Sequence, residues 1–516
     1  MTRALASLIL VAVAAAVPTT RPAPAPTPVP AQPKLVVALT IDQFRYDYLT
    51  RFRDDYTGGL RRLLERGAVF TQARYQHFPS VTAIGHSTYL TGALPAVSGI
   101  IGNDWWDRSA GRTVMAVSDP AEKIVGGEGE GASPRRMLVS TVGDELKIAR
   151  ARSRVVGLSM KDRGAIFTAG HMGDAVLWYD GQTGRFVSST FYGAALPEWA
   201  IRFNDERRAD AFRGAAWKGG ELPKESGPAL YGAIYGSPFG NDLLEAFAER
   251  AIEAERLGQR GETDLLTLSF SSNDSVGHAN GPDSPEVRDI SVRTDQALGR
   301  LFAYLEARVG MRNVLVILTA DHGVAPMPEV AAARRMPGGR IAAGTVRNAV
   351  QAALASRWGE GQWVVSPSDH SIYLNRQLIA DKKVDLGAAQ DVAKAAALAL
   401  PHVLRAYALH ELLTGVAADD PLGRPLVLSV QAQRTADVQV LLEPQWIFAA
   451  RGTTHGSVWG YDTHVPIVFM GPGIRPGRYR KPITVNDIAP TLADLLEVET
   501  PSGSAGRVLD EILAGR

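Results

Sequence analysis

Five short apolar runs, each ending in polar or charged residues, constrain the fold of this chain most strongly. Within each run, Val, Leu and Ile follow one another without alternating with polar residues, which is typical of strands buried on both faces of a sheet. Segments with helical periodicity, such as 57–68 and 291–310, lie between the runs. Strands that alternate with helices predict an α/β sandwich with a mostly parallel central sheet. The five runs are KLVVALTID (34–42), RVVGLSMKDR (154–163), DLLTLSFSSND (264–274), NVLVILTADHG (313–323) and VPIVFMGPG (465–473).

Two stretches depart from this alternation. Residues 175–240 are rich in Trp, Tyr and Gly, and residues 327–450 combine an Ala-rich helical segment with short strands such as QWVVS and DVQVLLE. We expect both stretches to be insertions that form a cap over the functional site. The folded chain is therefore predicted to be one domain, residues 34–516, that carries two cap insertions.

The composition excludes several kinds of protein. With 516 residues, 45% of them apolar, the chain can bury a large core. Its net charge of +1 gives no basic field that would attract nucleic acid or anionic lipid. The chain has no cysteine, which rules out disulfides, thiolate metal sites and a cysteine nucleophile.

The N-terminal region has the composition of an export signal. Residues 1–20 contain an arginine, an apolar run and then small residues, the pattern of a secretory signal peptide. The apolar run is short for a helix that crosses a bilayer, so an uncleaved membrane anchor is the less favoured alternative. Residues 21–33 are rich in Pro and Ala and predict an extended linker. We expect a periplasmic or secreted monomer without a stable membrane anchor after cleavage.

Aspartate and histidine side chains gather where the predicted strands end. In a parallel sheet, ligands bind beyond the carboxyl ends of the strands. Carboxylate oxygen and imidazole nitrogen together suit zinc, although manganese or another divalent ion would also fit. Three aspartates and three or four histidines are too many for one tetrahedral ion but suit two, which could clamp the attacking and leaving oxygens of a phosphoryl transfer. The candidate ligands are Asp42, Asp274, His278, Asp321, His322, His455 and His464.

The segment HFPSVTAIGHSTYLTG, residues 77–92, offers a nucleophile. Pro79 restricts the chain just before a short helical pattern, so a hydroxyl there would face helix N-terminal amides, which favour a phosphate. The residues alone leave the nucleophile open among four hydroxyls, and capping of the helix is the alternative role for the first two. The four hydroxyls belong to Ser80, Thr82, Ser87 and Thr88.

The motif MKDR supplies two cations, Lys161 and Arg163. Two positions apart on an extended segment, they could project to the same side and contact one phosphoryl group. The alternative is a surface pair flanking Asp162. An added pair of cations favours the second negative charge of a phosphate monoester over the single charge of a diester.

Six motifs, taken together and in order, resemble the alkaline phosphatase superfamily. They are TIDQFRYDYL, FPSVTAIGHSTYLTG with SGIIGNDWWD, SMKDRGAI, SNDSVGH, TADHG and GTTHGSVWGYDTHVP. The chain is most similar to the bacterial periplasmic alkaline phosphatases with a threonine nucleophile, which are related to type I phosphodiesterases and nucleotide pyrophosphatases. The resemblance extends from Lys34 to about Gly506. It implies an alkaline-phosphatase-like α/β/α sandwich.

The resemblance also implies roles for individual residues. Thr82 would be the nucleophile and would form a covalent phosphothreonine. One zinc ion would be held by Asp274, His278 and His455, and the other by Asp42, Asp321, His322 and the Thr82 oxygen. Asn103, Lys161 and Arg163 would contact the phosphoryl group. His464 would then lie near a ligand without binding a metal itself.

These features together predict an exported alkaline phosphatase that hydrolyses phosphate monoesters with two zinc ions per chain. A phosphodiesterase or nucleotide pyrophosphatase that uses the same site is the nearest alternative. A noncatalytic, metal-stabilised binding protein is less favoured, because the nucleophile and every ligand are intact. A sulfatase would commonly carry Cys or Ser in a Cys/Ser-x-Pro-x-Arg setting, which FPSVTAIG does not match. The expected substrates are small-molecule phosphate esters, and the sequence leaves their identity open.

Overall fold

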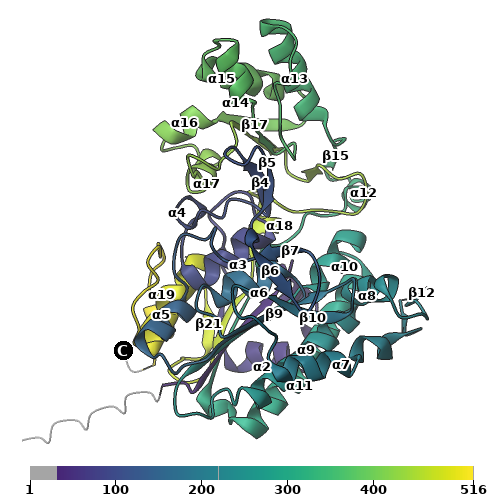
Figure 1. Ribbon diagram of the computed structural model, residues 1–516, viewed down its shortest axis with the longest axis vertical. Coiled ribbons are helices and arrows are strands. Elements are labelled where there is room, and N and C mark those ends of the chain that lie inside the picture. Colours follow the sequence, from purple (N-terminus) through teal and green to yellow (C-terminus); the bar gives the residue numbers. More distant parts are fainter. Residues whose placement is uncertain (1–31, 219, 515–516) are drawn as a thin grey trace, which may run out of the picture.

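A mixed β-sheet runs through the centre of the molecule, shown by the computed structural model in Figure 1. The structure describes residues 32–218 and 220–514, so the expected signal peptide and nearly all of the expected linker lie outside the described residues. Within the described chain the sheet has eleven strands. In order across the sheet they are β21 (Gly477–Tyr479), β2 (Ala68–Phe70), β20 (Ile467–Met470), β14 (Val314–Thr319), β1 (Leu35–Ile41), β13 (Asp264–Phe270), β8 (Val155–Ser159), β9 (Ala175–Asp180), β10 (Arg185–Ser189), β6 (Ser118–Val125) and β7 (Glu130–Ala132).

The parallel part of the sheet lies at its centre. β14, β1, β13, β8 and β9 pair in parallel, whereas β20 and β10 continue the sheet antiparallel on the two sides. Every residue of β1 and β14 is buried, as expected for apolar strands that are covered on both faces. Four of the five apolar runs thus form neighbouring parallel strands, and their carboxyl ends meet at one edge.

Helices cover both faces of the sheet, which gives the α/β/α sandwich that was predicted. One layer consists of α2 (Gly59–Arg66), α9 (Pro238–Ala254), α10 (Ser272–Asn280) and α11 (Pro285–Arg308). The other consists of α3 (Thr82–Thr91), α5 (Val142–Ala149), α6 (Asp162–Ala169) and α19 (Ile488–Leu496). Other short elements of this part of the chain are α1 (Tyr48–Arg51), α4 (Pro95–Ser98), α18 (Gly460–Thr463), and the paired strands β3 (Ala73–Arg74) and β22 (Ile483–Thr484).

Residues 327–450 form a separate lobe, coloured green in the upper part of Figure 1. Its own apolar core includes Val350, Leu354 and Trp363. Its helices are α12 (Pro328–Ala333), α13 (Thr345–Trp358), α14 (Arg376–Asp381), α15 (Leu386–Leu398), α16 (Leu409–Thr414) and α17 (Gly423–Val427). Its strands are β16 (Ser371–Ile372), β18 (Val438–Leu442) and β17 (Val403–Ala408) in one small sheet, and β15 (Gly339–Arg340) paired with β19 (Trp446–Ile447). The hairpin of β4 (Asp104–Asp107) and β5 (Arg112–Met115) reaches up to this lobe.

The segment 175–240 is not wholly an insertion, which corrects the expectation from its composition. β9 and β10 lie in the central sheet. Four of the aromatic residues that suggested a cap are instead buried in the main core: Trp178, Tyr179, Trp199 and Tyr231. Beside them, Phe186 of β10 stacks on Phe247 of α9 at 3.8 Å between ring centroids. The rest of the segment packs beside α9 and contains α7 (Glu198–Asp205), β11 (Ala216–Trp217), β12 (Gly220–Glu221) and α8 (Pro228–Tyr235). In the part of the chain that the structure covers, no helix combines the length and apolarity needed to cross a membrane.

Candidate active site

The candidate ligands meet beyond the carboxyl ends of three neighbouring strands. Asp42 directly follows β1, and Asp321 and His322 follow β14 after a single residue. Asp274 lies in the first turn of α10, which begins two residues after β13. Because these strands are parallel and adjacent, their ends deliver all of these side chains to one place.

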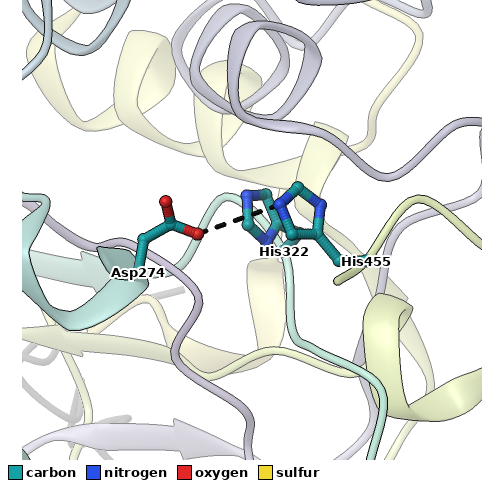
Figure 2. A group of neighbouring side chains, drawn as sticks. All are labelled: Asp274, His322 and His455. Atoms are coloured by element: carbon teal, nitrogen blue, oxygen red, sulfur yellow. Dashed lines mark ion pairs between the residues drawn. The ribbon is translucent and has the colours of Figure 1, made fainter. Parts of the chain in front are cut away.

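Two groups of side chains lie close enough to hold metal ions. Asp274, His322 and His455 form one group, and Asp42, Asp321 and His322 form the other. Within each group the potential ligand atoms lie within 4.8 Å of one another. Figure 2 shows the first group, in which the rings of His322 and His455 stack at 3.5 Å between centroids and Asp274 faces His455. His322 therefore stands between the two groups.

His278 lies beside the first group. Its Nε2 is 3.2 Å from Oδ1 of Asp274, and its ring centroid is 5.0 Å from that of His455. Because α10 places Asp274 and His278 one turn apart, both point toward the same position. The structure thus brings together the residues of the set implied by the resemblance, and additionally places His322 against His455.

The three histidines are held in the same way. The Nδ1 of each ring contacts a backbone carbonyl, which can only accept, so Nδ1 carries the proton, and Nε2 keeps its lone pair wherever the ring is neutral. Burial lowers the pKa of His322 and His455 and so favours the neutral ring, whereas Asp274 outweighs burial at His278 and raises its pKa. Each Nε2 in turn faces a carboxylate oxygen. A lone pair beside an anion is favourable only with a cation between them, and this orientation of the ring is typical of metal ligands. The contacts are His278 to Thr453 O at 2.7 Å, His322 to Gly323 O at 2.9 Å and His455 to Ser80 O at 2.8 Å.

Three buried carboxylates give the site a surplus of negative charge. Lys161 Nζ lies 2.7 Å from both Asp42 Oδ2 and Asp274 Oδ2 and is the cation that links them. Burial and the neighbouring Asp321 raise the pKa of Asp42 well above its usual value. Burial also acts to raise the pKa of Asp274, but Lys161 and His278 outweigh it and hold that pKa well below the usual value. One lysine does not balance three carboxylates, so the site suits divalent cations.

Two further observations fit this interpretation. Asp42 Oδ1 and Asp321 Oδ2 are buried, and within the described residues neither receives a hydrogen bond. Buried carboxylate oxygens without a donor are costly unless a cation compensates them. Burial lowers the pKa of His322 and of His455, which keeps both rings neutral and able to bind a metal. Oxygen and imidazole nitrogen are the donors that zinc prefers in such sites.

Thr82 lies at the first position of α3, beside the second group. The residue is 1% exposed, and its Oγ1 is 3.3 Å from His322 Nε2. Val81, not Thr82 or Ser80, is the capping residue of the helix, which removes the alternative role considered for both. Ser80 and Ser87 donate their hydroxyls to backbone carbonyls, of Ser457 and Ile84 respectively. Among the four hydroxyls considered, Thr82 is the one in contact with a candidate ligand.

Of the three expected phosphoryl-binding residues, Asn103 contacts the residue after Thr82, and Lys161 contacts two candidate ligands. The Oδ1 of Asn103 accepts a hydrogen bond of 2.8 Å from the backbone N–H of Ala83, which leaves its side-chain NH₂ to donate. Lys161 precedes α6 with an extended backbone, but Arg163 lies in the first turn of the helix, so the two do not share one extended segment as expected. Burial acts to lower the pKa of Arg163, but acidic neighbours, chiefly Asp162, raise it overall. Arg163 contacts Asp162 at 3.5 Å, whereas Lys161 is buried between carboxylates and is no surface residue.

Gln43 is a residue that sequence reasoning missed. Its side-chain amide donates to Asp274 Oδ1 at 2.6 Å, and its backbone N–H donates to Asp321 Oδ1 at 3.1 Å. Its backbone has a φ of 60°, in the left-handed region that few non-glycine residues occupy. Gly277 makes room for it, because a Cβ there would lie 1.9 Å from Gln43 Oε1. Its position directly after Asp42 was the one signal in the sequence.

Two other histidines play different parts. His86 contacts Asp321 Oδ2 at 3.3 Å through Nδ1 and Ser269 Oγ at 2.8 Å through Nε2, so it supports the second group from inside α3. His464 stacks on Tyr46 at 4.4 Å and donates from Nε2 to the Thr71 carbonyl. No contact joins His464 to a candidate ligand within the described residues.

The two ends of the green lobe are fastened at this site. The Oγ1 of Thr453 donates to the carbonyl of Ala325 at 2.8 Å, and its backbone N–H donates to the carbonyl of His278 at 2.8 Å. Ala325 returns a backbone hydrogen bond to Thr454. The insertion between His322 and His455 therefore leaves and re-enters the domain beside the ligands, which fixes where His455 lies.

Comparison with known proteins identifies the relatives of this chain. Residues 36–465 match the model of the family described as type I phosphodiesterase / nucleotide pyrophosphatase. The chain is 35% identical to a calcium-transporting ATPase of Myroides odoratus, over 93% of this chain and 95% of that protein. It is 34% identical to alkaline phosphatase PafA of Elizabethkingia meningoseptica, over 93% and 95%. It is 36% identical to alkaline phosphatase PhoV of Synechococcus elongatus, over 94% and 93%.

A solved structure shows the same architecture. The crystal structure of alkaline phosphatase PafA superimposes with a TM-score of 0.88 at 33% identity and covers 94% of this chain and 99% of that one. A variant of the same enzyme, in which a threonine is changed to serine and an asparagine, a lysine and an arginine are changed to alanine, has a TM-score of 0.88 as well. The predicted α/β fold is thereby confirmed over nearly the whole chain.

Proposed function

The chain belongs to the type I phosphodiesterase / nucleotide pyrophosphatase family and is a phosphatase of its bacterial alkaline phosphatase group, and from this premise we propose that it hydrolyses phosphate monoesters through a phosphothreonine at Thr82. The contact of Thr82 Oγ1 with His322 Nε2, at 3.3 Å and at a helix N-terminus, carries the proposal. It puts a hydroxyl where helix amides favour a phosphate and where a cation would activate the oxygen.

The two groups of ligands, with His278 joining the first and His322 assigned to the second, would hold two divalent cations, which we propose to be zinc. Asp274, His278 and His455 would hold one, and Asp42, Asp321 and His322 the other, with the Thr82 oxygen beside it. When bound, such ions supply positive charge that stabilises the attacking and leaving oxygens of an in-line displacement. The buried oxygens of Asp42 and Asp321 that receive no hydrogen bond and the shared orientation of the histidine rings support this assignment.

The chain's own residues account for the two displacements. The deprotonated Oγ1 of Thr82 attacks phosphorus, the ester P–O bond breaks, and the leaving alcohol takes up a proton. A water molecule then attacks the phosphothreonine, the Oγ1–P bond breaks, and inorganic phosphate leaves. Two inversions give net retention at phosphorus. Both nucleophiles must lose a proton, so we expect activity to rise toward alkaline pH.

Selectivity for monoesters is proposed to come from three residues of the candidate site, Asn103, Lys161 and Arg163. The NH₂ of Asn103 is free to donate to a phosphate oxygen, because its Oδ1 is already occupied by Ala83. Lys161 and Arg163 add two positive charges that a monoester dianion can use and a diester can use less. The variant of the PafA enzyme replaces the same four residue types, a threonine, an asparagine, a lysine and an arginine.

The family model also keeps a phosphodiesterase as the second candidate function. Such an enzyme would share the threonine and both metal groups but would gain little from Lys161 and Arg163. The name of the Myroides odoratus relative refers to calcium transport, and no feature of the described chain leads us to carry that activity over.

Several further properties are part of the proposal. We propose that residues 1–20 are removed as a signal peptide, that 21–33 act as a linker, and that the enzyme works as a monomer in the periplasm or outside the cell. Residues 34–516 would form one catalytic domain, with the lobe at 327–450 setting which small phosphate esters reach Thr82.

The test compares kcat/KM for nitrophenyl phosphate with that for bis-nitrophenyl phosphate on zinc-loaded protein. We expect a large monoester preference that falls at least tenfold in Arg163→Ala. Arg152→Ala is the matched control, because the side chain of Arg152 is 85% exposed and pairs with Glu262 away from the site. A diester preference in the parent enzyme would move the chain to the phosphodiesterase alternative.

A further inference from the structure

A cavity of about 490 Å³ lies between the β4–β5 hairpin and the green lobe. It contains none of the candidate ligands, and its nearest residue along the chain to the proposed catalytic site is Trp105, two positions after Asn103. Four of its lining residues are arginines, and one is an aspartate. The arginines are Arg108 from the hairpin, Arg136 from the loop after β7, Arg376 from α14 and Arg434 from the loop before β18.

Two of these arginines are balanced by one carboxylate. Asp437 is fully buried behind the wall and contacts Arg108 at 3.2 Å and Arg376 at 2.7 Å. The same carboxylate accepts hydrogen bonds from the backbone of Leu374 and the side chain of Gln390. Asp437 therefore holds two guanidinium groups in fixed positions at the cavity but neutralises only one charge.

The other two arginines lie over the same aromatic ring. Arg136 and Arg434 lie 5.8 and 5.3 Å from the ring centroid of Trp105, which is buried. The nearest carboxylate contact is between Arg136 and Asp107, at 3.7 Å, and no ion pair of Arg434 exists in the described chain. Burial, and after it the charge of Arg136, lower the pKa of Arg434. Two like charges held together in this way are unfavourable until an anion joins them.

Donors remain free on these groups. The hydrogen bonds of Arg434 to the protein both leave from Nη1, toward the carbonyls of Gly99 and Arg136. Its Nε and Nη2 are thus left for a ligand, as is Nη1 of Arg376, whose bonds to Asp437 use Nε and Nη2. Planar guanidinium groups with free donors fit the paired oxygens of phosphate and carboxylate groups.

We propose that this cavity binds a multivalent oxyanion, with phosphate or carboxylate groups, at a site separate from the one that contains Thr82. Four guanidinium groups against the carboxylates of Asp107 and Asp437 leave a surplus of two positive charges, which a dianion balances. The site is independent of the proposed catalytic chemistry. Because β4 runs from Asn103 directly into the cavity wall, an anion bound there also steadies the strand next to that asparagine.

The test measures binding of inorganic phosphate to the zinc-loaded full chain by equilibrium dialysis. We expect two phosphate sites per chain. Arg434→Gln should weaken one of them about tenfold or more, the factor expected when roughly one charge-assisted hydrogen bond is lost. Arg112→Gln is the control, since Arg112 lies on the same hairpin but is half exposed and pairs with Glu130. A single phosphate site in the parent, or two unchanged sites in Arg434→Gln, would overturn the proposal.

Two additions make this result decisive. Arg434 also donates hydrogen bonds to the carbonyls of Gly99 and Arg136, so Arg434→Gln could unfold the protein. Arg376→Gln is therefore a second variant. Asp437 remains paired in this variant, because its contact with Arg108 is kept. Thr82→Ala should keep the cavity site, which separates failure of this proposal from failure of the proposed phosphatase mechanism. Values of KM show the source of the anion. If Arg434→Gln raises KM only for substrates that carry a second phosphate, the cavity binds the remote phosphate of the substrate. If KM is the same in Arg434→Gln and the parent for all substrates, the cavity binds a free oxyanion.

Discussion

The side-chain amide of Gln43 donates a hydrogen bond of 2.6 Å to Oδ1 of Asp274, while the backbone N–H of Gln43 holds Asp321. One residue thus fixes a carboxylate in each of the two groups of candidate ligands. Neighbours that orient metal ligands in this way typically contribute a factor of ten to a hundred in metal affinity. The unusual backbone conformation of Gln43 is what lets it reach both carboxylates.

Gln43→Ala should therefore weaken zinc binding by about ten- to a hundredfold, as measured by competition with a chelating dye. Gln445→Ala is the matched control. Gln445 also has a positive φ, of 66°, so the change replaces the same residue type in the same backbone conformation, and no contact joins Gln445 to either group of candidate ligands in the described chain. Equal zinc affinity in the two variants would show that Gln43 does not position the ligands.

Gly85 permits the close approach of α3 to the loop after β14. A Cβ on Gly85 would lie 2.2 Å from the backbone oxygen of Asp321 and 2.6 Å from its Cα, so the backbone itself would have to move. Gly85→Ala should destabilise the protein by roughly 1–3 kcal/mol, as overpacked sites do. It should also weaken zinc binding, because Asp321 is displaced.

The control for this change is Gly232→Ala in α8, where a Cβ meets no atom within 4 Å. A glycine-to-alanine change at an open helical position is expected to be neutral or slightly stabilising. Thermal unfolding of both variants measures the difference. Equal melting temperatures for Gly85→Ala and the parent would contradict the close packing of α3.

Buried Asp462 gives a prediction about pH. Burial raises its pKa to about 7, although Ser457 donates two hydrogen bonds to it. The unfolded pKa is about 4, so the unfolded chain loses this proton first. The stability that the protonated form provides is fully present below pH about 4 and is lost as pH rises through about 7. The total effect is roughly 4 kcal/mol.

The side chain at position 462 cannot ionise in Asp462→Asn. The melting temperature of this variant minus that of the parent should therefore increase as pH rises from about 4 to about 8. Metal-free protein is used at every pH, so that acid release of zinc does not contribute. Asp419→Asn, at an exposed position, is the control. A constant difference in melting temperature across this range would mean that Asp462 is ionised in the folded protein throughout.

Removal of the metal gives a further prediction. Chelation should abolish phosphatase activity and lower the melting temperature, because three carboxylates then remain buried with Lys161 as their linking cation. Each ion present at about a thousand times its Kd adds roughly 4 kcal/mol to folding stability. Zinc should restore both properties at two ions per chain, as measured by elemental analysis. Full activity in thoroughly stripped protein would exclude the metal-dependent scheme.

The sequence was most informative where local patterns decide structure. Continuous apolar runs predicted β1, β8, β13 and β14, and the polar residues at their ends, such as Asp42 and Asp321, then had to meet at one edge. His455 follows no strand of the sheet, and its choice as a ligand over His464 came only from the resemblance. Its position depends on how the chain returns from the 327–450 lobe, and this long-range packing leaves no periodicity in the sequence.

Two features of the structure could not have been inferred from pattern. The aromatic residues near β9 and β10 suggested a cap because burial under a sheet and exposure in a pocket favour the same residue types. Gln43 has no sequence pattern of its own, since its role depends on the simultaneous proximity of Asp274, Asp321 and Gly277.

The most direct test of the central claim is to trap the covalent intermediate on Thr82. Zinc-loaded enzyme is quenched in acid while it turns over nitrophenyl phosphate, and its peptides are analysed by mass spectrometry. Thr88→Ala is the control, since Thr88 is buried on the same helix and its hydroxyl bonds to no candidate ligand in the described chain. The account predicts one phosphoryl group on Thr82 in the parent and in Thr88→Ala, and neither modification nor turnover in Thr82→Ala. Undiminished turnover in Thr82→Ala, or a phosphoryl group on another residue, would contradict it.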